Sequence, residues 1–215
     1  MFCKPLATTS AMLFAAAVSI AIAATPDTPG VMNPDTDKPG LPVGAKAPDA
    51  MLQTIDGEEV TLASLYADGP VIVTFYRGGW CPFCTKALAG WEGRMDEVEA
   101  IGATFVAITP ESPDNAASTG AKHAPSMTIL SDAHHEASRD YHLSFNLPDD
   151  VKTKYKGYGI DLEKSNASHN WELPAPGTFV IDRDGTIVYA WADWDYKKRA
   201  DPDEVLKAAT EAAKK

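Results

Sequence analysis

The sequence is poor in cysteine and has no excess of basic residues. Its 215 residues include three cysteines, and 19 lysines and arginines face 30 aspartates and glutamates, so the formal net charge is −11. Three cysteines are too few for a small domain held together by disulfides. Proteins that bind nucleic acid or anionic membrane surfaces usually present a basic face, so the acidic balance argues against both partners. The hydrophobic content of 45% is that of a soluble globular protein.

An uncharged, largely apolar stretch follows Lys4 and ends in Ala21-Ile22-Ala23. This small-x-small pattern is the one that signal peptidase reads. The stretch is short and alanine-rich for a transmembrane helix. We therefore interpret residues 1–23 as a secretory signal peptide for export to the periplasm, with an uncleaved anchor as the alternative. Cleavage removes Cys3, and no membrane association is expected afterwards.

The remaining chain divides into a linker and one domain. Residues 24–42 hold five prolines and show no hydrophobic period, which is typical of a disordered or extended linker. Residues 43–215 are long enough for one domain with a sizeable core. Their patterns predict hairpins at 51–61 and 179–191, strands at 71–76, 104–109 and 127–130, and helices at 82–101, 113–123, 132–141 and 202–213. This order predicts an α/β fold with a mixed central sheet flanked by helices.

Residues 142–171 do not fit this alternation. They contain Phe145, Tyr155, Tyr158 and Trp171 among prolines, glycines and charged residues, and they are long for a plain loop. Two interpretations remain open: an ordered insertion near a functional site, or a surface excursion packed down by its aromatic side chains.

Cys81 and Cys84 are the candidate catalytic residues. The apolar strand leads through Arg77-Gly78-Gly79-Trp80 to Cys81-Pro82-Phe83-Cys84, where a helix is expected to begin. The first turn of a helix has unpaired N–H groups and the positive end of the helix dipole, which stabilise a thiolate. Pro82 suits the first helical position, where its missing N–H costs nothing. The spacing allows a short-loop disulfide that opens and closes readily.

Two other interpretations of the pair are weaker. A zinc site needs further Cys or His ligands at suitable spacing, and no second C-x-x-C is present. A purely structural disulfide would suit a non-enzymatic interaction module.

The adjacent His134 and His135 point in different directions on a helix, so we expect a solvated helix surface rather than a metal site. Lys197-Lys198-Arg199 is expected to be a solvated turn. No metal or organic cofactor is expected.

The sequence resembles the alkyl hydroperoxide reductase and thiol-specific antioxidant (AhpC/TSA) superfamily of thioredoxin-fold redoxins, and its peroxiredoxin-like branch in particular. The resemblance rests on four segments that lie within about residues 41–213: LPVGAKAPDAML, DGEEVTLASL, VIVTFYRGGWCPFC and PGTFVIDRDGTIVY. It implies a thioredoxin fold with an N-terminal hairpin extension. It also implies thiol-based redox activity.

The resemblance permits two alignments of the cysteine pair. Aligned to thioredoxins, Cys81 attacks, Cys84 resolves, and Pro176 takes the place of the cis-proline that faces the pair. Aligned to peroxiredoxins, Cys84 takes the peroxidatic position and Cys81 replaces a hydroxyl residue. The arginine of that family is then absent, since Pro176 and Gly177 stand there, and Arg77 is a candidate substitute. The alternative for Arg77 is a surface arginine in a salt bridge.

These observations favour an exported thiol peroxidase that cycles between the Cys81/Cys84 dithiol and disulfide. The substrate is a peroxide, and a thioredoxin-like protein is the electron donor. Exchange with protein disulfides is the alternative. The candidate substrate-site residues are Arg77, Trp80, Pro82, Pro176 and Thr178.

Overall fold

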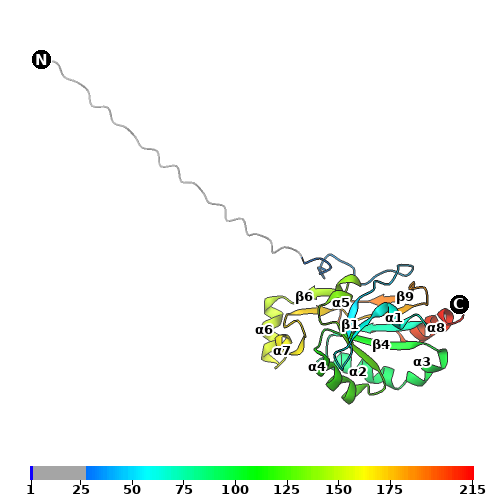
Figure 1. Ribbon diagram of the computed structural model, residues 1–215. Coiled ribbons are helices and arrows are strands. Elements are labelled where there is room, and N and C mark those ends of the chain that lie inside the picture. Colours follow the sequence, from blue (N-terminus) through cyan, green and yellow to red (C-terminus); the bar gives the residue numbers. More distant parts are fainter. Residues whose placement is uncertain (2–27) are drawn as a thin grey trace.

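The computed structural model describes Met1 and residues 28–215, and residues 28–215 form an α/β fold around one central sheet (Figure 1). The sheet has seven strands in the order β2-β1-β5-β4-β3-β8-β9. Strands β3, β4 and β5 run parallel, and the outer pairs are antiparallel. The bounds are Met51–Gln53 (β1), Glu59–Thr61 (β2), Val71–Phe75 (β3), Thr104–Thr109 (β4), Thr128–Ser131 (β5), Gly177–Ile181 (β8) and Ile187–Ala192 (β9).

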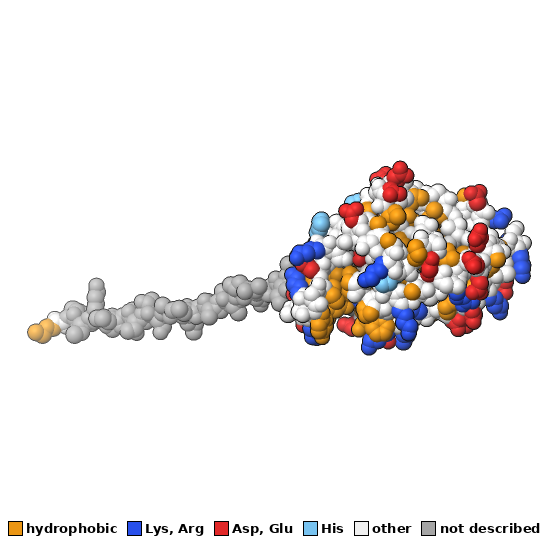
Figure 2. Space-filling view, turned by 90° about the horizontal axis from the view of Figure 1, so that it is seen from below, with side chains coloured by type: hydrophobic (Ala, Val, Ile, Leu, Met, Phe, Trp, Pro, Cys, Tyr) orange, Lys and Arg blue, Asp and Glu red, His pale blue; other side chains and the backbone are white. Residues whose placement is uncertain are grey.

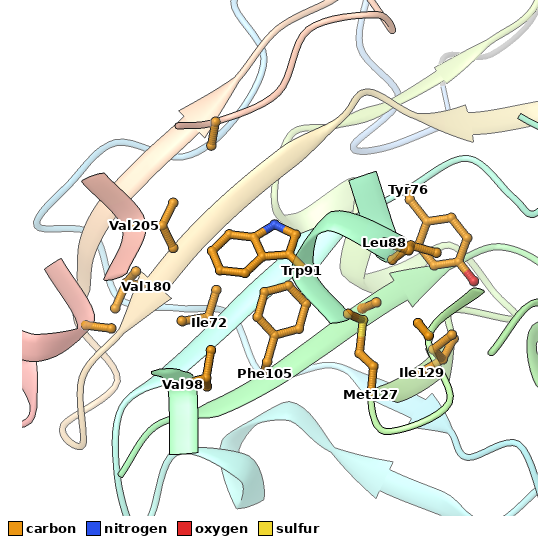
Figure 3. Packing of buried hydrophobic residues seen from close by; sticks show 14 of the residues in the cluster. Ile72, Tyr76, Leu88, Trp91, Val98, Phe105, Met127, Ile129, Val180 and Val205 are labelled. Carbon is orange, nitrogen blue, oxygen red and sulfur yellow. The ribbon is translucent and has the colours of Figure 1, made fainter. Parts of the chain in front are cut away.

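Helices cover both faces of this sheet. One face packs against α2 (Pro82–Glu92), α3 (Met95–Ile101), α4 (Pro113–His123) and α8 (Pro202–Ala212). The other face packs against α1 (Leu62–Leu65) and α5 (Glu136–Asp140). Because successive side chains of a strand point to opposite faces, Ile72 joins the first cluster and Val73 the second. Figure 3 shows the first cluster, in which Trp91 of α2 packs on Phe105 of β4 with ring centroids 4.7 Å apart.

The central strands and both hairpins are confirmed. Strand β3 is buried along its whole length, as its β-branched and aromatic composition predicts. Strands β1 and β2 pair across the turn at Gly57, and β8 and β9 pair across the turn at Gly185. Both glycines have φ near +80°, a conformation that glycine adopts without strain.

The long helix expected at 82–101 is two helices, so that prediction is wrong. Helix α2 ends at Glu92, and α3 begins at Met95 after the C-cap Gly93 and the non-helical Arg94. The Arg94 side chain pairs with Glu97 and with Asp203 at the start of α8. Gly93 has a low helix propensity, and it lies where the chain bends between α2 and α3 so that Arg94 can form both ion pairs. Gly102 ends α3 in the left-handed conformation, as expected.

The segment at 142–171 is an ordered insertion. It contains β6 (Ser144–Asn146), α6 (Asp149–Gly157) and α7 (Leu162–Ser165), and β6 pairs with β7 (Glu172–Pro174). Its residues Leu147, Leu162 and Trp171 form a small core with Leu173. Trp80 of the C-x-x-C loop packs against this core, so the insertion lies beside the predicted site.

Buried polar groups attach the insertion to α5. Glu172 accepts two hydrogen bonds from Arg139 and one from Ser144. His135 is fully buried and bonds to Ser168 and Asn170 of the insertion. The expected solvated helix surface is therefore wrong for His135, which has φ 59° and stands before the first residue of α5.

The N-terminal part of the described chain lies on the domain. Residues 28–42 contain no helix or strand, but Met32 donates to the Ser144 carbonyl and Gly40 to the His142 carbonyl. The predicted signal peptide at 1–23 lies outside the described residues apart from Met1. Within residues 28–215, no helix combines the length and apolarity needed to span a bilayer. Figure 2 shows basic side chains scattered among acidic ones on one face of the molecule.

Candidate active site

The two cysteines lie at the N-terminus of α2, which follows the fully buried strand β3 after a short loop. Cys81 is the N-cap residue, Pro82 occupies the first turn, and Cys84 follows one turn later. Both thiols are reduced in this structure and both are buried, at 1% and 0% exposure. The neighbouring Phe83 is 40% exposed. The site is therefore a buried dithiol with an exposed aromatic residue between the two cysteines in the sequence.

Two glycines allow the loop before Cys81 to fold tightly. Gly78 has φ +143°, and a Cβ there would lie 2.3 Å from the Trp80 Nε1 atom. A Cβ on Gly79 would lie 2.1 Å from Oγ1 of Thr119 in α4. Both separations are far below van der Waals contact. The Gly-Gly pair thus lets the loop pack against Trp80 on one side and α4 on the other.

The pKa values of the two cysteines are shifted in opposite directions. A hydrogen bond from the Cys84 thiol to the Cys81 sulfur is the main reason that the pKa of Cys81 is lowered to about 6. Burial opposes this shift, whereas the Cys84 backbone N–H and the charges of Arg77 and Arg199 support it. The same hydrogen bond, together with burial, raises the pKa of Cys84. Of the two cysteines, Cys81 is therefore the one whose surroundings favour the thiolate.

Arg77 is buried inside a cage of aromatic rings rather than exposed in a surface salt bridge. Its guanidinium carbon lies 5.1 Å from the Trp80 ring centroid, 5.7 Å from that of Tyr155 and 4.6 Å from that of Tyr196. Nη2 also donates to the Tyr155 hydroxyl group. Such cation–π contacts hold an arginine firmly when water is excluded. Arg77 thereby joins the C-x-x-C loop to α6 of the insertion.

Arg199 contacts Cys84 directly, although no sequence pattern pointed to this contact. Its Nη2 donates to the Cys84 sulfur over 3.2 Å. The expectation of a solvated turn at residues 197–199 is therefore wrong for Arg199. The segment between β9 and α8 folds back over the start of α2, because Tyr196 packs against Phe83 with ring centroids 5.6 Å apart.

A groove of about 780 Å³ opens beside Arg77. Its walls include Phe145 and Tyr155 of the insertion, Trp194 and Tyr196 after β9, and residues 31–35. Pro176 is one of its lining residues. Arg77 also lines the groove, and its Nε atom is buried without a hydrogen-bond partner. The groove thus combines apolar side chains with a buried guanidinium group.

The expectation of a cis peptide bond at Pro176 is wrong, because the Ala175–Pro176 bond is trans. Strand β7 ends at Pro174 and β8 begins at Gly177, so the chain continues in one extended direction through Pro176. The trans isomer is the lower-energy form and fits this path. Thr178 is buried, and its hydroxyl lies 3.0 Å from that of Thr74, next to Cys84 in the same small cavity.

A buried carboxylate on the other side of the loop was also missed. Glu111 follows β4 and accepts hydrogen bonds from Thr119, Ser165 and Tyr76. Burial raises its pKa, although the Gly79 N–H and these hydroxyl groups oppose the shift. Glu111 thus links the C-x-x-C loop to α4 and to the insertion. A lone acidic residue after a strand carries no sequence signal for such a role.

A mixed central sheet with a reduced dithiol at a strand-to-helix junction defines a redox protein of the thioredoxin-fold class. Solved structures support this fold. The peroxidoxin BcpB of Mycobacterium tuberculosis superposes with a TM-score of 0.61 at 20% identity, covering 81% of this chain and 98% of that one. A peroxiredoxin-like protein from Aquifex aeolicus gives 0.64 at 18% identity, covering 81% and 90%.

Sequence comparison then gives the family. The AhpC/TSA family profile matches residues 43–190. A putative peroxiredoxin of Mycobacterium tuberculosis is 31% identical over 150 residues, which are 70% of this chain and 84% of the relative. Peroxiredoxin Bcp of Escherichia coli K12 is 27% identical over 154 residues, covering 72% and 87%. The chain belongs to the AhpC/TSA family and is a peroxiredoxin-like, thiol-dependent enzyme.

Proposed function

We propose that this protein reduces peroxides with Cys81 as the attacking thiolate and Cys84 as the resolving thiol. The observation that carries the proposal is the position of Cys81 at the N-cap of α2, next to Cys84, whose hydrogen bond lowers the pKa of Cys81 to about 6. A thiolate is the nucleophilic form of cysteine, so Cys81 is reactive at neutral pH. This assignment follows the thioredoxin alignment of the pair rather than the peroxiredoxin one.

The cycle has three steps. The Cys81 thiolate attacks one peroxide oxygen, the O–O bond breaks, and the released alkoxide takes a proton, leaving Cys81 as a sulfenic acid. Cys84 then attacks the Cys81 sulfur as a thiolate, and water leaves as the disulfide forms. An external dithiol donates two electrons through a mixed disulfide and restores both thiols. We propose a thioredoxin-like protein as this donor.

The groove beside Arg77 is the proposed approach for an organic peroxide. Its aromatic and proline walls suit an apolar group, and the buried Arg77 guanidinium suits an oxygen of the substrate. Phe83, which follows Cys81 by two residues, forms an exposed aromatic pair with Tyr196. This pair is the proposed contact for the reducing protein, since exposed aromatic side chains are favoured at protein interfaces.

We also propose that the protein is exported and acts in the periplasm. Support comes from the sequence alone: Lys4, the apolar stretch after it and the Ala21-Ile22-Ala23 pattern. N-terminal sequencing of protein recovered from the periplasmic fraction is expected to begin at Ala24. Recovery with Met1 intact in the membrane fraction would show an uncleaved anchor instead.

Steady-state assays test the proposed reaction. In a Cys3→Ser background, the purified protein is supplied with thioredoxin and its reductase, and peroxide consumption is compared with reduction of a protein disulfide such as insulin, each rate being corrected for the rate with thioredoxin and its reductase alone. We expect turnover with hydrogen peroxide and with cumene hydroperoxide, and its loss in both Cys81→Ser and Cys84→Ser. Insulin reduction without peroxide turnover would overturn the proposal and favour a thiol–disulfide oxidoreductase.

A further inference from the structure

Arg199 is held in a fixed position against Cys84. Its Nη1 donates to the backbone carbonyls of Tyr196, over 2.8 Å, and of Lys198. Its Nη2 donates to the Cys84 sulfur over 3.2 Å. The segment itself is tied down by the Lys198–Asp193 ion pair of 2.8 Å. The guanidinium is therefore aimed at Cys84 by the local backbone and does not depend on the substrate for its orientation.

The two arginines of the site make different contacts, although the charges of both lower the pKa of Cys81. The Arg77 side chain is engaged with aromatic rings and the Tyr155 hydroxyl, and its backbone N–H contributes to stabilising charge on Cys84. The Arg199 side chain directly contacts the Cys84 sulfur. The other ionisable groups that act on Cys84 are Cys81, which raises its pKa, and Tyr76, which is hydrogen-bonded to the buried Glu111.

We propose that Arg199 is a catalytic residue of the second half of the cycle, where it stabilises negative charge on Cys84. This inference rests on the proposed function. In the resting dithiol the charge resides on Cys81, so Arg199 faces a neutral thiol. After peroxide attack Cys81 is an uncharged sulfenic acid. It therefore no longer carries the negative charge that raises the pKa of Cys84.

Arg199 then acts twice on the same sulfur. Cys84 loses its proton and attacks the Cys81 sulfur, forming the S–S bond while the sulfenic oxygen takes a proton and leaves as water. During reduction, the donor thiolate attacks Cys81, the S–S bond breaks, and its electron pair leaves on Cys84. A thiolate of lower pKa leaves faster, so the arginine accelerates re-reduction. It also raises the fraction of Cys84 that is thiolate at neutral pH, which accelerates resolution.

Single-turnover kinetics of Arg199→Gln test this role. Stopped-flow mixing with hydrogen peroxide separates sulfenic acid formation, trapped with dimedone, from disulfide formation. We expect the rate of sulfenic acid formation to stay within about threefold of wild type. The rate of disulfide formation should fall by about tenfold or more, because loss of one nearby charge shifts the pKa of Cys84 by about one unit. Arg199→Lys should recover part of the rate. Lys197→Gln, which removes a nearby exposed charge, should change neither step.

A titration gives a readout that does not require peroxide. In a Cys81→Ser background, thiolate absorbance at 240 nm reports the pKa of Cys84, which Arg199→Gln should raise by about one unit. Cooperative thermal unfolding of each variant verifies that the fold is retained. An unchanged Cys84 pKa, or a slowed first step with an unchanged second, overturns the inference. Absence of sulfenic acid in all variants overturns the proposed function, while the titration still decides the role of Arg199.

Discussion

Cys81 and Cys84 are three residues apart and equally buried, yet their neighbours give them opposite proton affinities. Cys81 is the helix N-cap and accepts a hydrogen bond from the Cys84 thiol, whereas Cys84 is buried one turn further on. A sequence can place two cysteines at the start of a helix, but it cannot say which sulfur holds the shared proton. That distinction comes chiefly from the hydrogen bond between the two side chains and from burial in the folded protein, whereas the charge of Arg199 lowers the pKa of both cysteines.

The reaction of Cys81 with an alkylating agent should follow the thiolate fraction. Because the pKa of Cys81 is lowered to about 6, the iodoacetamide rate should rise with pH around pH 6 and be nearly constant above pH 7.5. Cys84→Ala removes the thiol donor, so the midpoint should rise by about one unit or more. Mass mapping identifies the alkylated residue. A wild-type midpoint near pH 8.5, the value of a free cysteine, would contradict the shared proton.

At the scale of elements, the site depends on how closely the C-x-x-C loop approaches α4. Gly79 has no room for a side chain, because its Cβ would lie 2.1 Å from Oγ1 of Thr119. The sequence marks this loop by its glycine pair but does not say what lies against it. The break of the helix at Gly93 is similar, since the ion pair of Arg94 with Asp203 of α8 is a tertiary contact. Local sequence patterns predict which helices and strands form. Contacts between residues far apart in the sequence determine where these helices and strands bend.

The substitution Gly79→Ala should destabilise the protein by about 1–3 kcal/mol, as overpacking of a close contact does. Gly90→Ala is the matched control, because Gly90 lies in α2 and a Cβ there meets open space. That change should stabilise the protein by roughly 0.5–1 kcal/mol through helix propensity. Urea unfolding under reducing conditions measures both. Equal effects of the two substitutions would show that the approach to α4 is not tight.

At the scale of the whole molecule, the insertion and the segment after β9 complete a site that the core fold leaves open. Arg77 lies against Tyr155 of the insertion and against Tyr196, and the groove lies between these two segments. The sheet, its flanking helices and the two cysteines were predicted from periodicity, turn signals and family resemblance. The position of the insertion was not, because its aromatic residues fit both a surface excursion and a site wall.

The partly buried ion pair of Arg139 and Glu172 should matter for the attachment of the insertion. Glu172→Gln removes the charge from the hydrogen bonds with Arg139, so the free energy of unfolding should fall by about 1–3 kcal/mol. Asp150→Asn breaks an exposed pair with Lys154 and should cost less than about 0.5 kcal/mol. Thermal and urea unfolding measure both variants. Similar small effects would contradict the role of this pair as a structural attachment.

The same pair predicts a pH dependence of stability. Burial alone would raise the pKa of Glu172, but hydrogen bonds from Arg139 and Ser144 lower it below its ordinary value of 4.5. A depressed folded-state pKa contributes stability that is present above pH 4.5 and lost as the pH falls further. The difference in unfolding free energy between wild type and Glu172→Gln should therefore shrink toward low pH. A difference that grows on acidification would contradict this assignment.

The central claim is that Cys81 attacks the peroxide, and the position of the first sulfenic acid tests it most directly. In a Cys3→Ser background, Cys84→Ser and Cys81→Ser are each mixed with one equivalent of hydrogen peroxide in the presence of dimedone, and peptide mass mapping locates the adduct. We predict rapid labelling of Cys81 in Cys84→Ser and labelling at least about a hundredfold slower in Cys81→Ser. Rapid labelling of Cys84 in Cys81→Ser, with Cys84→Ser inert, would contradict the account.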